Sequence, residues 1–279
     1  MAPLNSFCML LLAFLFLGVA PSKYFAFEQG ETSIPFTYSG SHGPSHWGTL
    51  NPNYTACSAG HFQSPVNIMR NQTTLTKALK PLIKSYIPAN ATLLTNGVNV
   101  GIHFESECGS MNIDEKKYSL KQLHWHSPSE HKIDGIEYPL ELHLVHQLQD
   151  GSFSVIGILF QYGEPDPFLT SIEKSLDKLA KKVTAGDQHA KVYLGTLNAK
   201  LIKKISHRFF RYVGSLTTPP CSENVVWNVI PTPRTVSKKQ IELLKAPLGE
   251  VYKNNNRPCQ ALDGRKIEIA PRASSVHEL

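Results

Sequence analysis

The most informative stretch of the 279-residue sequence is residues 122–131, which read QLHWHSPSEH. The alternating pattern around it predicts a β-strand over residues 118–127. Alternate residues of a strand share a face, so His124 and His126 point to one side and Trp125 points to the other. Two imidazoles on one face of a strand are the beginning of a metal-binding donor set.

A second strand is expected over residues 140–147, which read LELHLVHQ after a turn near Asp134-Gly135. If the two strands pair in antiparallel fashion, one histidine of the second strand faces the first two. His143 and His146 are three residues apart, so a regular strand points them to opposite faces and only one can join. Three convergent imidazoles are the minimum protein donor set of a catalytic zinc, with the fourth position left for water.

Polar residues accompany these histidines in strands that are otherwise apolar. Gln122 shares a face with His124, and Glu141 shares a face with His143. Each of these side chains can accept a hydrogen bond from an imidazole N–H and thereby fix the tautomer that a metal requires. We therefore expect Gln122 and Glu141 to support the metal-binding histidines.

Two other interpretations fit parts of this region. Buried histidines often act only as hydrogen-bonding core residues, which is what we expect of His131 and His146. The His-x-His pair with Glu130 also has the spacing of a cupin ligand set. Cupins have glycine at two flanking positions that this chain fills with Tyr118 and Glu137, and no second cupin motif follows.

Composition places the chain among ordered globular proteins. Hydrophobic residues make up 41% and charged residues 18%, which excludes disordered, collagen-like and coiled-coil chains. The net charge is +6, from 28 Lys and Arg against 22 Asp and Glu, and the cations are scattered along the chain. Because no basic stripe alternates with aromatic residues, we expect no nucleic-acid partner.

The amino-terminal region is typical of a secretory signal peptide. Residues 7–20 form an apolar run of 14 residues, too short to span a bilayer comfortably, and small residues follow it. We expect a signal peptide over residues 1–22, with cleavage between Ala20 and Ala26. The mature protein should enter the secretory route without a stable membrane anchor.

Sequons and cysteines agree with that route. Three N-x-[ST] sequons predict glycosylation at Asn53, Asn71 and Asn90. Four cysteines remain after the signal peptide, and an even number in an oxidising compartment indicates disulfides, with three complete pairings open. These cysteines are Cys57, Cys108, Cys221 and Cys259.

The remainder of the chain is typical of one sheet-rich domain, without repeats, linkers or low-complexity segments. Turn residues and 19 prolines recur among short apolar runs. Further strands are expected over residues 99–105, 153–162, 225–230 and 266–269. Two helices have start signals, which are Asp166 before Pro167 and Ser237 with Gln240 three residues later.

Taken together, these motifs resemble the alpha-class carbonic anhydrases, and the local sequence is close to plant members. The similarity covers residues 36–269 and rests on separated motifs in the same order. They are Gly43-Pro44-x-x-Trp47-Gly48 and residues 63–68, 124–131, 141–146, 214–221, 227 and 256–258. The resemblance implies a mainly β fold, in which one domain (residues 23–279) surrounds a large, twisted, mostly antiparallel sheet of about ten strands with short peripheral helices.

The resemblance also implies a zinc site at the bottom of a conical cleft. His124, His126 and His143 carry over as the zinc ligands. Thr217 would accept a hydrogen bond from zinc-bound hydroxide and donate its own proton to Glu130. The residues expected to meet substrate are Thr218, for bicarbonate, and an apolar wall for carbon dioxide formed by Val145, Val155, Leu216, Val225 and Trp227.

The implied activity is the reversible hydration of carbon dioxide to bicarbonate and a proton, with esterase activity as a side reaction. The family pattern pairs Cys57 with Cys221 in a disulfide, which leaves Cys108 and Cys259 as free thiols, an intermolecular bridge or a second disulfide. The implied form is a monomer or homodimer. The implied compartment is the apoplast, with a plastid reached through the secretory route as the alternative.

One position departs from the family pattern. Many fast members carry a histidine directly after an Asn-Gly pair on the cleft rim, whereas this chain has Val98 after Asn96-Gly97. Valine cannot carry a proton, so we expect slow turnover at low buffer that added imidazole restores. Lys121, at another rim position, is the candidate substitute. Some plant relatives look like storage or binding proteins with damaged sites, so a non-catalytic or weakly active storage or binding protein is the alternative.

Overall fold

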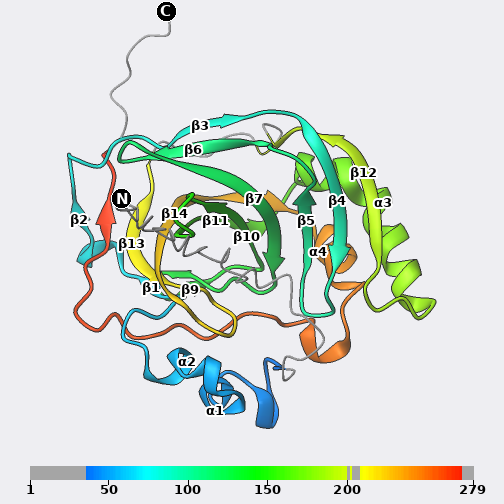
Figure 1. The fold of residues 1–279 in the computed structure, drawn as a ribbon, viewed down its shortest axis with the longest axis horizontal. Coiled ribbons are helices and arrows are strands. Elements are labelled where there is room, and N and C mark those ends of the chain that lie inside the picture. The colour runs from blue at the N-terminus through cyan, green and yellow to red at the C-terminus, as the bar shows by residue number, and fades with distance from the viewer. Residues whose placement is uncertain (1–35, 200–201, 203–207, 272–279) are drawn as a thin grey trace, which may run out of the picture.

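The computed structural model describes residues 36–199, 202 and 208–271. The expected signal peptide and its cleavage site lie outside these residues. The main element of the described chain is one large twisted sheet, with helices at its margins (Figure 1). No helix within the described ranges is long and apolar enough to cross a membrane.

The main path of the large sheet runs through ten strands. In spatial order they are β12 (Lys191–Leu197), β4 (Ala89–Thr95), β5 (Val100–Phe104), β7 (Lys116–His126), β10 (Leu140–Gln147), β11 (Phe153–Tyr162), β14 (Glu223–Val236), β13 (Phe210–Ser215), β15 (Glu268–Ile269) and β2 (Thr74–Leu75). Neighbours are antiparallel except in the pairs β11–β14 and β15–β2.

Two further strands extend this sheet. They are β6 (Gly109–Ile113), which pairs with β7, and β3 (Ile83–Tyr86), which pairs with β6. The sheet of the described residues therefore has twelve strands, against the ten or so expected. A separate small sheet contains β1 (Asn67–Ile68), β8 (Lys132–Ile133) and β9 (Ile136–Glu137).

The two expected helices begin where their sequence signals place them. The Asp166 side chain accepts hydrogen bonds from the first backbone N–H groups of α3 (Pro167–Thr184). Ser237 and Gln240 form a capping box at the start of α4 (Lys238–Lys245). Two one-turn helices lie near the amino-terminal end of the described chain and are α1 (Trp47–Leu50) and α2 (Ala56–Ala59).

The strands at the centre of the sheet separate two environments. On β10, Leu140, Leu142 and Leu144 join a large apolar core that also contains the buried side of α3. The residues between them, Glu141 and His143, point to the opposite face, which we call the site face. Burying leucine on one side and polar groups on the other fixes the register, because a slip of one residue would exchange them.

Candidate metal centre

Strand pairing brings three imidazoles together on the site face. β7 supplies His124 and His126, and β10 supplies His143, which is the direct antiparallel partner of His124. The ring centroids of the three histidines lie 4.8–5.0 Å apart. His126 and His143 are buried, whereas His124 is partly exposed. Of the two histidines that the sequence left open on β10, His143 joins the cluster.

The donor atoms of this cluster have the spacing of a zinc site. One nitrogen from each imidazole lies within 4.8 Å of the other two. His143 Nδ1 and His124 Nε2 are 3.3 Å apart, and zinc–nitrogen bonds of about 2.1 Å at tetrahedral angles place two donors about 3.4 Å apart. His126 Nε2 is buried and has no hydrogen-bond partner in the described part of the chain. The donor set therefore fits a zinc ion.

Each imidazole has its other nitrogen bonded to a protein oxygen, which fixes the tautomer. The three bonds run from His124 Nδ1 to Gln122 Oε1 (2.8 Å), from His126 Nδ1 to the Asn255 carbonyl (2.6 Å) and from His143 Nε2 to Glu141 Oε1 (2.9 Å). The nitrogens left with free lone pairs are the three that converge.

Burial keeps the cluster in the form that binds metal. It lowers the pKa of His124 well below the usual value, and the neighbouring His126 and His143 lower it further. It also lowers the pKa of His126 to about 4 and lowers that of His143. Burial alone would raise the pKa of Glu141, but His131 and His143 hold it well below its usual range. The imidazoles are therefore neutral at pH 7 beside an ionised carboxylate.

Glu141 also organises the loop that follows β7. Its Oε2 accepts hydrogen bonds from the backbone N–H groups of Glu130 and His131, at 2.9 and 2.8 Å. Its Oε1 accepts from His131 Nδ1 at 2.7 Å as well as from His143. A Cβ atom at Gly157 on β11 would lie 2.8 Å from that Oε1, so only glycine leaves room for the carboxylate.

Glu130 is a fully buried carboxyl beside the cluster. Its Oε1 accepts from the Arg257 backbone N–H at 2.9 Å, and its Oε2 lies 3.5 Å from His126 Nε2. Burial raises its pKa to about 7, against the opposing effects of His143, the Arg257 N–H and a hydrogen bond with the Thr217 side chain. Thr217 is itself buried, in the loop between β13 and β14. The structure thus brings Glu130 and Thr217 together beside the three histidines.

The apolar residues expected near substrate form one cluster on the site face. Val145, Val155 and Trp227 are successive partners across β10, β11 and β14, in the row that also contains Gln122. Val225 belongs to the same buried cluster, and Leu216 is packed against it. Thr218 follows Thr217 and is also buried.

Comparison with known proteins assigns this arrangement to a family. Residues 42–271 match the family profile described as eukaryotic-type carbonic anhydrase.

The chain belongs to the alpha carbonic anhydrase family.

Its relatives include alpha carbonic anhydrase 7 of Arabidopsis thaliana, with 36% identity over 86% of this chain and 86% of the relative. Dioscorin DB3L of Dioscorea polystachya is 37% identical over 89% of this chain and 90% of the relative. Among solved structures, dioscorin complexed with ascorbate has a TM-score of 0.82 and 33% identity, covering 87% of this chain and 100% of that chain. The alpha-carbonic anhydrase of Thermovibrio ammonificans with the inhibitor sulfanilamide has a TM-score of 0.75 and 33% identity, covering 85% and 99%.

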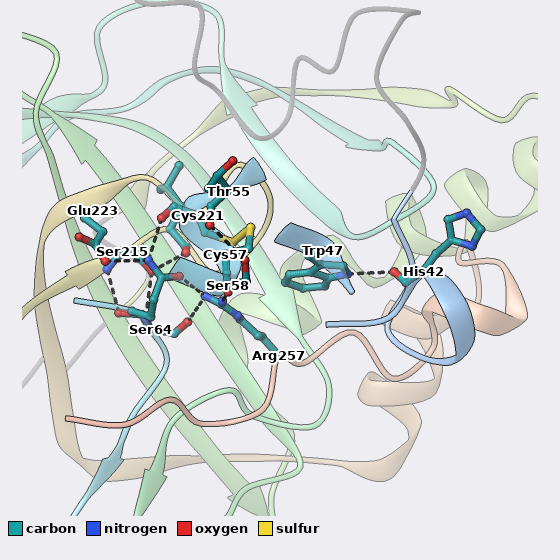
Figure 2. The surroundings of a disulfide bond; sticks show 12 residues. His42, Trp47, Thr55, Cys57, Ser58, Ser64, Ser215, Cys221, Glu223 and Arg257 are labelled. Carbon is teal, nitrogen blue, oxygen red and sulfur yellow. Dashed lines mark hydrogen bonds between the residues drawn. A yellow bond between two sulfur atoms is a disulfide. The ribbon is translucent and has the colours of Figure 1, made fainter. Parts of the chain in front are cut away.

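A disulfide joins α2 to the loop between β13 and β14, which also carries Thr217. Cys57 on α2 is joined to Cys221, four residues after Thr217, so the pairing implied by the family pattern is confirmed (Figure 2). The buried guanidinium of Arg257 donates to the Cys57 carbonyl at 2.8 Å and stacks over the Trp47 ring, with Cζ 5.6 Å from the ring centroid. The same arginine binds the Glu130 carboxylate through its backbone N–H.

Several contacts around the metal centre were not predicted by the sequence analysis. His131 Nε2 is 2.7 Å from the Tyr212 hydroxyl, which is 2.9 Å from Ser64 Oγ. Asn255 binds His126, and Arg257 binds Glu130. These contacts join residues more than 80 positions apart, and the motifs at 63–68, 124–131 and 256–258 gave no indication of which residues pair.

The remaining residues that the sequence analysis singled out are not part of the histidine cluster. Cys108 and Cys259 are free thiols in this chain. His146 lies on the opposite side of β10 from the metal centre, with Nε2 2.8 Å from the Tyr86 hydroxyl. Val98 is at the β4–β5 turn, where its carbonyl accepts from Asn255 Nδ2 at 3.0 Å, and Lys121 is exposed on β7.

Proposed function

We propose that the chain is a zinc-dependent carbonic anhydrase that reversibly hydrates carbon dioxide to bicarbonate and a proton. The observation that carries this proposal is the convergence of His124 Nε2, His126 Nε2 and His143 Nδ1, each held by an oxygen on its other nitrogen. When bound there, zinc supplies the Lewis acidity that makes water a nucleophile near neutral pH.

The chain's own residues would orient the reactants. Glu130 would accept a hydrogen bond from the Thr217 hydroxyl. The threonine oxygen is then free to accept a hydrogen bond from the nucleophile, which would direct the nucleophile's lone pair toward carbon dioxide. Thr218, which is buried next to Thr217, would bind bicarbonate. The apolar wall of Val145, Val155, Leu216, Val225 and Trp227 would hold a small nonpolar substrate and exclude competing water.

The step that removes the proton lacks the histidine that many family members carry at the cleft rim. Each hydration cycle releases one proton, and a carrier works best when its pKa lies near the working pH. Val98 cannot supply such a group at the rim. We therefore expect turnover at low buffer to be limited by proton transfer.

We also propose that the protein is made as a secreted precursor. This rests on the apolar run at residues 7–20 and on the three sequons, whose asparagines Asn53, Asn71 and Asn90 are exposed. Slow hydrolysis of small activated esters is the expected side activity, because the same nucleophile meets any small acyl carbon held against the apolar wall.

The test is zinc analysis and stopped-flow hydration of carbon dioxide by the purified mature protein, at low buffer and with added imidazole. One zinc per chain with hydration of carbon dioxide supports the proposal, and a rise on imidazole addition shows that proton transfer limits turnover at low buffer. One zinc per chain without hydration in either condition favours the storage or binding alternative. The likeness to dioscorin, solved in complex with ascorbate, makes ascorbate the first ligand to try in that case.

A further inference from the structure

His103 on β5 faces the metal centre from a neighbouring strand. Val100 and Ile102 of β5 belong to the large apolar core. Gly101 and His103 therefore point to the site face. In the antiparallel pair β5–β7, Gly101 is the partner of His124, and His103 is the partner of Gln122.

This register sets the separation between His103 and the nearest metal-binding residue. His103 and His124 are diagonal neighbours on one face, which places their backbone positions about 7–8 Å apart. Gln122 occupies the position directly opposite His103 and binds His124 Nδ1 at 2.8 Å. A backbone separation of this size leaves room for an ordered water between the two side chains.

The residues paired with His103 across the sheet become more exposed from β7 toward β12. Across β4, His103 pairs with the partly exposed Thr92, and Thr92 pairs with Tyr193 on β12, whose side chain is 60% exposed. His103 is itself partly exposed. It thus lies between the buried end of the row, at Gln122, and the open edge of the sheet.

We infer that His103 carries the proton between the metal centre and bulk solvent, in the role that Val98 cannot fill. The inference rests on the proposed function. A water proton released at the centre passes through ordered water to a lone pair of neutral His103, and the imidazolium then gives its proton to a buffer base. No carbon bond changes in this step, and His103 returns to its neutral form.

Some charged groups around His103 stabilise its protonated form and others destabilise it. Glu105, two residues along β5, favours the imidazolium and is held by the Thr92 hydroxyl at 2.6 Å. Lys121, next to Gln122 on β7, opposes a positive charge. Tyr193 is the titratable group on β12 in this row.

The kinetic test uses His103→Ala in the zinc-loaded protein. At low buffer, kcat should fall at least about tenfold while kcat/KM for carbon dioxide stays unchanged, because proton transfer follows the hydration step. Imidazole should restore kcat, and Val98→His should restore it in the double variant. His61→Ala, which removes a side chain that is 82% exposed, is the matched control and should leave both constants unchanged.

A second readout does not depend on activity. In the metal-free protein, the His103 imidazole resonance, assigned by its loss in His103→Ala, should titrate between about pH 6 and 8. A resonance that does not titrate between pH 5 and 9 would overturn the inference.

The kinetic outcomes separate the two proposals. Hydration whose low-buffer kcat is the same in His103→Ala, or falls only in Lys121→Ala, overturns the role of His103 and leaves the proposed function standing. A parallel loss of kcat and kcat/KM assigns His103 a structural role instead. A wild-type protein that binds zinc without hydrating carbon dioxide overturns both.

Discussion

Glu141 Oε1 accepts a hydrogen bond from His143 Nε2 at 2.9 Å, and the same oxygen accepts from His131 Nδ1 at 2.7 Å. The first bond directs His143 Nδ1 at the metal centre, and the second ties that centre to the loop that carries Glu130. A single buried carboxylate therefore sets both the tautomer of His143 and the position of the loop that carries Glu130.

Replacing this carboxylate should weaken metal binding more than it weakens the fold. In Glu141→Gln, the single amide oxygen is taken by the backbone N–H groups of Glu130 and His131, so the NH2 group faces His143 Nε2, which loses its acceptor. We expect zinc affinity to fall about 10- to 100-fold in competition with a chelator. Glu137→Gln, on exposed β9, is the control, and equal affinities in the two variants would contradict this role.

Gly157 should be required for the same reason. A Cβ atom there would lie 2.8 Å from Glu141 Oε1, so Gly157→Ala should lower zinc affinity and reduce the free energy of unfolding by about 1–3 kcal/mol. At Gly249, an added Cβ would meet its nearest neighbour at 3.7 Å, which makes Gly249→Ala the matched control. If both variants behave alike in chelator competition and in denaturant unfolding, the steric argument is wrong.

The Cys57–Cys221 disulfide should contribute strongly to stability. It closes a loop with a sequence separation of 164, for which the chain-entropy model gives about 5 kcal/mol as an upper value. Cys57→Ser with Cys221→Ser should therefore lower the free energy of unfolding by about 2–5 kcal/mol in denaturant titration. Cys259→Ser removes a free thiol and should change it little. A double variant as stable as wild type would exclude this contribution.

Acid should destabilise the protein partly through His146. Burial lowers its folded-state pKa from 6.5 to about 4, so the unfolded chain binds a proton first as pH falls. The contribution of His146 is complete above pH 6.5 and is lost as pH approaches 4, by about 3 kcal/mol in total. The difference in the free energy of unfolding between wild type and His146→Gln should shrink as pH falls over that range. A difference in the free energy of unfolding that stays constant with pH would contradict this role of His146.

The local parts of the fold were predictable from the sequence. β10 and β11 have the expected bounds because their apolar and polar residues alternate or form an unbroken run. β14 continues beyond the expected end at residue 230, because Pro231 and Pro233 interrupt the sequence pattern without ending the strand. The pairing of β14 with β11 accommodates them by a register shift between Ile158 and Phe160.

The rest of the fold depends on contacts that no local pattern contains. β4 reads ANATLLT and has no regular alternation of apolar and polar residues, so its pairing with β5 and β12 defines it more than its own sequence does. Within the site, the His-x-His spacing identified two donors, and family resemblance selected His143 over His146. The Asn255 carbonyl that holds His126 is 129 residues away in sequence, and only the folded chain brings it there.

The most direct test of the proposed chemistry is oxygen-18 exchange between carbon dioxide and water at equilibrium, measured against zinc occupancy. Loss of label from carbon dioxide should rise in proportion to bound zinc. It should fall by at least about 100-fold in Thr217→Ala, which keeps the three histidines. A protein with one zinc per chain that exchanges label no faster than the buffer would contradict the assignment of carbonic anhydrase activity.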